Sequence, residues 1–234
     1  MNVLLFIQNG TESVITRVME APVPEAVKSM NIWDLTLKGG LLMIPIAFFL
    51  FIAVAVLIER IFVFKKIDKE DPTFMNRIKD YIHEGKIGSA INLCQMTNTP
   101  ISRMIAKGIS RLGRPMNDIL VAIENVGNIE VAKLEKGFTW VATAAAIAPM
   151  IGFLGTVTGM VRAFFSMASA GTNVDITTLS SGIYEALVTT VAGLIAGIIA
   201  LLAYNYLVYR VTKVMNTMEA RSMEFLDLLN EPTK

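Results

Sequence analysis

The sequence predicts an all-α, polytopic membrane protein with three transmembrane helices, two of which extend into the cytoplasm, and a helical cytoplasmic domain. Of its 234 residues, 53% are hydrophobic and only 18% are charged, whereas soluble domains contain about 25% charged residues. Three long segments carry no charge at all. No segment shows the alternation of apolar and polar residues that is typical of a β-strand.

Each uncharged segment approaches or exceeds the ~20 residues that a helix needs to cross the hydrocarbon core of a bilayer. They are "LLMIPIAFFLFIAVAVLI", which begins at Leu41, "WVATAAAIAPMIGFLGTVTGMV", which begins at Trp140, and "ALVTTVAGLIAGIIALLAYNYLVY", which begins at Ala186. We therefore predict transmembrane helices at 40–64, 140–165 and 183–209. The second and third are rich in Ala, Gly and Thr, which favours burial among other helices over contact with lipid.

Lysine and arginine residues near the ends of the spans predict the orientation of the chain. They follow the first and third spans and precede the second, whereas none occurs between Ala163 and Gly182. This distribution places residues 65–139 in the cytoplasm as a helical domain and residues 210–234 there as a helical tail. Residues 1–39, which include a predicted amphipathic helix, and the loop 166–182 then lie on the outer side.

Prolines and glycines predict the helix boundaries of the cytoplasmic region. Asp71-Pro72, Thr99-Pro100 and Arg114-Pro115 are typical helix starts, and Gly85 and Gly113 are typical ends. The helix that opens at Pro115 is predicted to run unbroken into the second span. Its apolar spacing predicts a buried stripe of Ile119, Ile123, Val126 and Ile129, and the spacing in the tail predicts one of Val214, Met218, Met223 and Leu226.

Two charges stand at the outer ends of the second and third spans. Arg162 ends the second span and Glu185 begins the third, so a short outer loop would bring them to a similar depth. We hypothesise that they form an ion pair, within one subunit or across a subunit boundary. Glu185 could instead be a hydrated residue at the membrane interface, or it could face a protein interior, where ionisable groups usually mark ion pathways.

Glycines recur at four-residue spacing in both of these spans. Gly155 and Gly159 form one such pair and Gly193 and Gly197 another, and this small-xxx-small pattern lets membrane helices approach closely. Together with Gly152, these residues are predicted to serve helix packing.

Threonines place hydroxyls within the same two spans, at positions 156, 158, 189 and 190. Threonine in a membrane helix most often bonds to a carbonyl of its own helix, and this interpretation stays open for each of them. Thr189 shares a stripe with Glu185 and Gly193, whereas Thr190 is rotated from it by about 100°. The third span therefore offers polar groups on more than one side, which is typical of a helix packed on several sides.

Several function classes lack support in the sequence. It contains no phosphate-binding loop, no cluster of metal ligands and no nucleophile–base arrangement, so we expect no enzyme, no metal and no cofactor. The net charge of +1 gives no sign of nucleic-acid binding, and the single cysteine, Cys94, excludes an intramolecular disulfide.

The segments "GFLGTVTGM" and "GIYEALVTTVAGLIAGIIALLAYN" together resemble the MotA/TolQ/ExbB proton-channel family. The cytoplasmic "GSAINLCQMTNTPISRMIAKGI" and the pre-span "WDLTLKGGLLMIPI" fit its ExbB branch. The resemblance implies a homopentamer in the bacterial inner membrane, with a periplasmic N-terminus and a cytoplasmic C-terminus. Its second and third spans would line a pore that holds the transmembrane helices of an ExbD-like or TolR-like partner, whose aspartate carries the protons.

The resemblance also implies roles for individual residues. By position within the motifs, Thr156 and Thr190 would line the pore near the partner's aspartate, with Glu185 near its outer part and Thr189 as a further candidate. The implied function is to use proton-motive force, through a TonB-like protein, to energise TonB-dependent outer-membrane transport. The alternatives are a TolQ-like subunit that acts through a TolA-like protein in envelope maintenance, and a non-conducting membrane scaffold.

Overall fold

The computed structural model of the chain describes residues 39–67, 73–169 and 176–230. All of the elements in these ranges are α-helices, and no strand occurs among them. Three helices are long and apolar enough to cross a membrane: α3 (Met43–Ile67), α8 (Phe138–Ser169) and the apolar part of α9 (Ile176–Asn230). The predicted all-α fold with three spanning helices is therefore confirmed.

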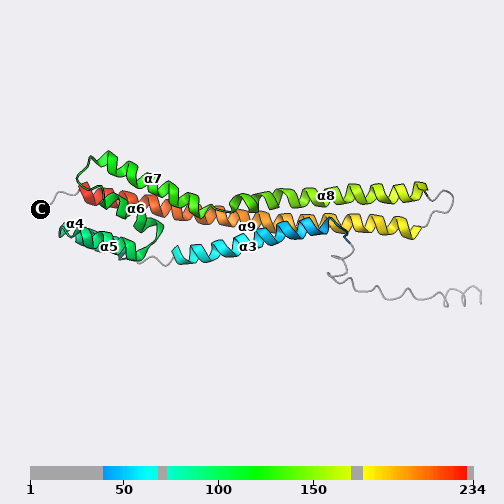
Figure 1. Cartoon of the computed structure of the whole chain (residues 1–234), viewed down its shortest axis with the longest axis horizontal. Coiled ribbons are helices and arrows are strands. Elements are labelled where there is room, and N and C mark those ends of the chain that lie inside the picture. Colours follow the sequence, from blue (N-terminus) through cyan, green and yellow to red (C-terminus); the bar gives the residue numbers. More distant parts are fainter. Residues whose placement is uncertain (1–38, 68–72, 170–175, 231–234) are drawn as a thin grey trace, which may run out of the picture. The chain divides into compact units, whose positions relative to one another are not determined.

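Helices α8 and α9 run side by side and form the most extensive contact between any two elements (Figure 1). Helix α3 packs against both of them. Helix α9 contains 55 residues, so at 1.5 Å per residue it measures about 80 Å. A bilayer core is only about 30 Å thick, which means that α9 extends far beyond the membrane.

The second span does not continue unbroken from the helix before it, and this prediction was wrong. Helix α7 (Met116–Leu134) ends at the cap residue Glu135, and α8 begins afresh at Phe138. Gly137 lies between them with a φ of +90°, which interrupts the helical hydrogen-bond series and is readily adopted only by glycine. The isolated glycine, which the sequence analysis did not treat as a stop, is the point at which the chain turns from one helix into the other.

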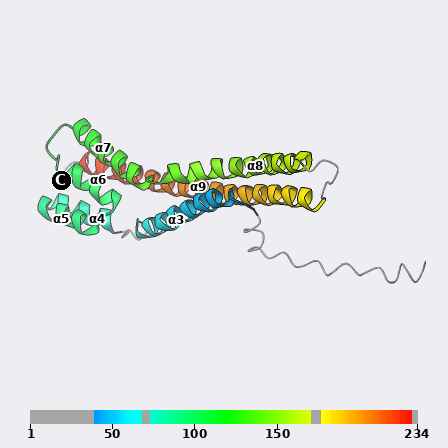
Figure 2. The ribbon, with the colours of Figure 1, turned by 45° about the vertical axis from the view of Figure 1, so that its right-hand side comes forward.

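Three short helices precede α7: α4 (Phe74–His83), α5 (Ile87–Thr97) and α6 (Pro100–Ile109). Helices α4, α6 and α7 contact the C-terminal half of α9, and α5 packs against α4 and α6 (Figure 2). The start of α6 has the predicted form, because the Thr99 hydroxyl accepts the Ser102 N–H in a capping box and Pro100 follows the cap. Gly85 and Gly113 adopt the positive φ expected at helix ends. The predicted start at Asp71-Pro72 lies outside the described residues.

One apolar core joins the spanning helices to the short ones. Its largest fully buried side chains come from α3, α4, α6, α7 and α9, and they include Phe64, Phe74, Ile105, Ile123, Leu207 and Phe225. The same core therefore fixes the position of the helical domain against the end of α3 and the long extension of α9.

Two residues of the predicted stripes lie on the wrong face. Ile129 is 56% exposed, whereas its neighbour Glu130 is buried at 3%. Glu130 lies seven residues after the buried Ile123, so the helix has turned by about 700°, almost two full turns, and Glu130 faces the same side. Ile129 lies only six residues after Ile123, so it is about 120° away from that side. The same rule places Phe225, seven residues after Met218, in the core and leaves Met223 67% exposed.

Helices α8 and α9 both extend into the predicted loop 166–182, because α8 ends at Ser169 and α9 begins at Ile176. Residues 170–175, and all of the predicted N-terminal segment 1–39 except Gly39, lie outside the described residues.

Candidate functional site

Helices α8 and α9 approach so closely at Gly152 and Gly193 that their main-chain atoms are in contact, and we call this interface the seam. A Cβ atom added to Gly193 would lie 2.6 Å from the carbonyl oxygen of Ala148 and 2.8 Å from the Cα of Gly152. Both neighbours are main-chain atoms, which cannot rotate away. Glycine at 152 and 193 therefore allows the two helix axes to approach more closely than any side chain would permit.

The other three predicted packing glycines lie along the same seam. A Cβ at Gly155 would lie 2.5 Å from Thr189 Cγ2, one at Gly159 would lie 2.7 Å from Ala186 Cβ, and one at Gly197 would lie 2.4 Å from Pro149 Cγ. The seam thus extends over about three turns of α8, and small residues face each other along its whole length.

Thr190 is half-buried and joins the two helices directly. Its hydroxyl donates to the carbonyl oxygen of Gly152 in α8 at 2.8 Å and also lies 3.3 Å from the Ala186 carbonyl of its own helix. In an α-helix the Gly152 carbonyl also accepts the N–H of residue 156. The Thr190 hydroxyl therefore lies next to the turn that carries Thr156, which is half-buried and donates to Phe153 O at 2.6 Å.

Thr189 has a different environment from Thr190. It is buried at 1% exposure, and its hydroxyl lies 2.8 Å from the carbonyl of Glu185 and 2.9 Å from that of Gly39, in the turn before α3. Its hydroxyl thus bonds beyond its own backbone and connects α9 to the start of the first span. Thr158, by contrast, bonds only to carbonyls of its own helix, Leu154 and Gly155.

Arg162 and Glu185 are brought together at the outer end of the seam. Arg162 Nη1 lies 3.7 Å from Glu185 Oε1, with side-chain exposures of 71% and 35%. Gly40 has a φ of +66°, and a Cβ there would lie 2.0 Å from Glu185 Oε1, so the absence of a side chain at position 40 leaves room for the carboxylate. The pair lies within one chain and is largely open to solvent.

We expect this exposed pair to contribute little to stability. In a double-mutant cycle of Arg162→Ala and Glu185→Ala, the coupling free energy should be about 0.2–1 kcal/mol and should shrink at high salt. Thermal unfolding of the four proteins in detergent measures it. Strictly additive effects at low salt would contradict the pairing.

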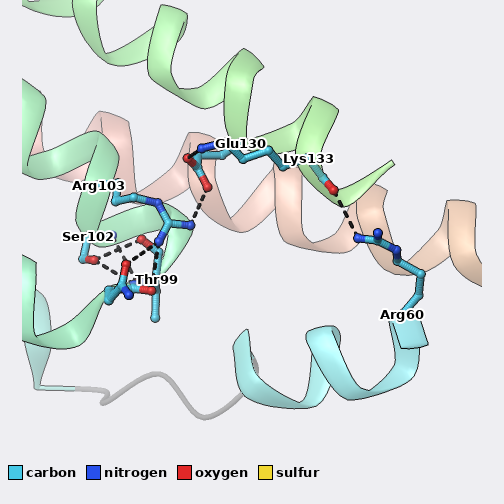
Figure 3. Close-up of polar contacts among 7 residues, drawn as sticks. Arg60, Thr99, Ser102, Arg103, Glu130 and Lys133 are labelled. Atoms are coloured by element: carbon cyan, nitrogen blue, oxygen red, sulfur yellow. Dashed lines mark hydrogen bonds and ion pairs between the residues drawn. The ribbon is translucent and has the colours of Figure 1, made fainter. Parts of the chain in front are cut away.

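A polar cluster around the buried carboxylate of Glu130, which was not predicted from the sequence, joins α6 and α7 (Figure 3). Glu130 of α7 accepts hydrogen bonds from Arg103 of α6 and from Lys133 Nζ, the latter at 2.7 Å. Arg103 also donates to Asn98 Oδ1 at 2.6 Å. The position of Glu130, seven residues after the core residue Ile123, was the signal in the sequence that could have revealed it.

The same cluster extends to the first span through Arg60. This side chain is 7% exposed, and its Nη1 donates to the carbonyl oxygen of Lys133 at 3.1 Å. Lys133 lies in the last turn of α7, where carbonyls have no partner within the helix. Arg60 therefore caps α7 immediately before the break at Gly137, so that α3, α6 and α7 meet at this point (Figure 3).

The cluster keeps Glu130 ionised despite its burial. Burial acts to raise the pKa of this carboxyl, but the hydrogen bonds and charges of Arg103 and Lys133 outweigh it, and the pKa lies below its usual range. A carboxyl whose pKa is lower in the folded state contributes stability above its unfolded pKa of about 4.3, and this contribution is lost as the pH falls further.

We therefore predict that Glu130→Gln lowers the free energy of unfolding at pH 7 by about 1–3 kcal/mol, because a neutral amide replaces the buried carboxylate that accepts the charge-assisted hydrogen bonds of Arg103 and Lys133. The difference between wild type and variant should shrink between pH 5 and pH 3. Thermal unfolding in detergent across this pH range measures it. A difference that does not change with pH would mean that the charge of Glu130 is not what stabilises the cluster.

Among the residues that the structure describes, no group of three or more His, Cys, Asp or Glu side chains could hold a metal ion. What distinguishes the molecule is the seam of glycines and threonines inside two spanning helices. The fold and this seam define an integral membrane protein whose spanning helices pack tightly and carry hydroxyls within the apolar region.

Comparison with known proteins identifies the family. The sequence profile of the MotA/TolQ/ExbB proton channel family matches residues 96–220, more than half of the chain. The chain belongs to this family, as the resemblance of its motifs implied. The match covers the helical region from the end of α5 through α6, α7 and α8 into the C-terminal half of α9.

The relatives include proteins of both the ExbB and the TolQ type. The chain is 29% identical over 170 residues to a putative biopolymer transport protein, ExbB-like 3, of Synechocystis sp., which covers 72% of this chain and 81% of that protein. It is 29% identical over 223 residues to the Tol-Pal system protein TolQ of Haemophilus influenzae, with coverages of 85% and 91%. It is 39% identical over 102 residues to the biopolymer transport protein ExbB of Neisseria gonorrhoeae, with coverages of 43% and 46%.

Proposed function

We propose that this protein is an ExbB-like proton-channel subunit that works with an ExbD-like partner. The complex uses proton-motive force to drive a TonB-like protein and so energises TonB-dependent outer-membrane transport. It lies in the bacterial inner membrane, with a periplasmic N-terminus and a cytoplasmic C-terminus. No enzymatic activity is part of the proposal.

One observation carries this proposal. Between Phe138 and Arg162 of α8, and between Glu185 and Arg210 of α9, the chain has no Asp, Glu, Lys, Arg or His, yet half-buried hydroxyls of Thr156 and Thr190 lie along the seam. Proton relays across membranes use acidic or histidine side chains. These spans therefore suit one wall of a proton path whose titrating group is supplied by a partner.

Exposed apolar surface supports assembly into a larger complex. Phe153, Val161 and Phe165 of α8 and Leu187 and Ile195 of α9 are each more than half exposed in the single chain. Apolar faces of this size on two adjacent helices mark contact with lipid or with other subunits. We propose that the chain forms a homopentamer, with α8 and α9 around a central pore that contains the partner's transmembrane helices.

A TolQ-like role is the second candidate, because the TolQ relative aligns over 85% of this chain. In that case the partners are TolR-like and TolA-like proteins, and the role is envelope maintenance. Deletion of the gene separates the two roles, since loss of receptor-dependent uptake indicates the first and a leaky, detergent-sensitive envelope the second.

Co-expression with a single-span ExbD-like or TolR-like protein tests the assembly. Purification through a tag on this chain should recover the partner, and imaging should show five copies around the partner's helices. Recovery of this chain alone, or as a monomer, would contradict the proposal.

A further inference from the structure

An apolar groove lies between α7 and the C-terminal half of α9, two segments that run alongside each other in Figure 1. Its volume is about 530 Å³. The buried side chains of Met104 and Met218 form its floor, together with Gly127, which contributes no side chain. A Cβ at Gly127 would lie 3.2 Å from Met104 Cε, so the depth of the groove depends partly on this glycine.

The dimensions of the groove suit a short helix. Its walls extend from Leu120 to Val131 on α7 and from Met215 to Leu226 on α9. Twelve helical residues measure about 18 Å, or three turns. A segment of about ten residues could therefore lie along the groove.

The groove is apolar, adaptable and acidic. Four of its lining residues are methionines, and thioether side chains adjust readily to different partners. Among the residues that the structure describes, its only ionisable lining residues are Glu124 on one wall and Glu219 on the other, with no lysine or arginine. Met223 belongs to the same lining and is 67% exposed. An apolar groove between two carboxylates is complementary to an amphipathic segment that carries basic residues.

The groove is also on the proposed cytoplasmic side, close to the membrane. It begins five residues beyond Arg210, which follows the apolar part of α9, so it starts about 8 Å along the helix axis from that boundary. A single-span partner has chain on both sides of the bilayer, and its cytoplasmic flank is enriched in Lys and Arg.

We propose that this groove binds the basic, amphipathic cytoplasmic arm of the pore partner. The inference rests on the proposed function, because it requires such a partner. It adds a second point of attachment, outside the membrane, between the two kinds of subunit. Glu124 and Glu219 contact the basic side chains of the arm, and the methionines contact its apolar face.

Cysteine accessibility in the full-length protein tests this. Met223→Cys places a thiol on the groove wall, and Met96→Cys, at a position that is 86% exposed on α5, is the matched control. The native Cys94 interferes little, because it is buried and burial raises its pKa to about 11, which keeps the thiol protonated at pH 7. Maleimide labelling is compared for the chain alone, with the full partner, and with a partner that lacks the residues before its span.

Of the three samples, we expect only the one with the full partner to label more slowly at position 223, by about tenfold. That factor corresponds to about nine-tenths occupancy of the groove. Labelling at position 96 should be the same in all three samples. Glu124→Gln with Glu219→Gln should reduce the protection, and Asp80→Asn, an exposed carboxylate outside the groove, should not.

Three results would overturn the inference, and they are distinguishable. If the partner co-purifies but position 223 labels equally fast, the groove does not bind the arm and the proposed function stands. If labelling is slow in all three samples, a second copy of this chain covers the groove. If the partner does not co-purify at all, the proposed function fails and the inference fails with it.

Discussion

Gly193→Ala is expected to lower the amount of folded protein in the membrane. The new methyl group would lie 2.6 Å from the Ala148 carbonyl oxygen and 2.8 Å from the Gly152 Cα, and neither atom can move without shifting helix α8. Overpacking of this kind costs about 1–3 kcal/mol or more. The separation of the helices would also break the hydrogen bond from Thr190 to Gly152. Protein level in the membrane and thermal unfolding in detergent measure the effect.

Gly88→Ala is the matched control, because it makes the same change in a helix where no atom lies within 4 Å of the added Cβ. Alanine favours a helix over glycine by about 1 kcal/mol, so this variant should be as stable as wild type or more so. If Gly193→Ala behaved like Gly88→Ala, the close approach of α8 and α9 would not be needed for the fold.

Thr190→Val, and separately Thr156→Val, is expected to slow energised transport about tenfold while the protein still folds and assembles. Valine keeps the shape of threonine and removes only its hydroxyl. Loss of one such hydrogen bond inside a membrane protein costs about 0.6 kcal/mol, which the fold should tolerate. If the hydroxyls assist proton transfer to a partner's carboxylate, raising that barrier by about 1.4 kcal/mol slows transport tenfold. Receptor-dependent uptake, normalised to protein in the membrane, measures it.

Thr158→Val is the control for both variants, because Thr158 lies in α8 with Thr156 and its hydroxyl, unlike that of Thr190, bonds to carbonyls of its own helix. It should transport at the wild-type rate. Thr189→Val should instead lower the amount of assembled protein, because this buried hydroxyl bonds to the turn before α3. If Thr156→Val and Thr190→Val both transported normally, neither hydroxyl would be needed for proton transfer, which is the result expected of a non-conducting scaffold.

Local signals in the sequence predicted much of the fold. Long uncharged segments are sufficient to identify spanning helices. The helix start at Thr99-Pro100 and the turns at Gly85 and Gly113 could be predicted because they depend on backbone geometry within about one helical turn. The proximity of Arg162 and Glu185 could also be predicted from the sequence, because two antiparallel spans joined by a short connection bring their ends together.

The remaining features depend on tertiary contacts that no local pattern contains. At Gly137, where the chain turns from α7 into α8, an added Cβ would lie 3.2 Å from Val56 Cγ1 of α3, which is far away in the sequence. The seven-residue spacing from Ile123 places Glu130 on the buried face, but only the ion pair with Arg103, which comes from another helix, explains how a carboxylate is stable there. The bond from Thr189 to Gly39 joins residues that are 150 positions apart, so the sequence placed Thr189 and Thr190 on different faces of the helix without showing what either hydroxyl binds.

Proton flux into liposomes tests the central claim, that this chain forms one wall of a proton path and a partner completes it. Liposomes that contain the chain together with an ExbD-like partner should take up protons under an imposed membrane potential. Liposomes with the chain alone should show no more uptake than empty ones, and Thr190→Val should reduce the flux of the complex about tenfold. A chain that conducts protons without a partner, or a complex that conducts none, would contradict the account.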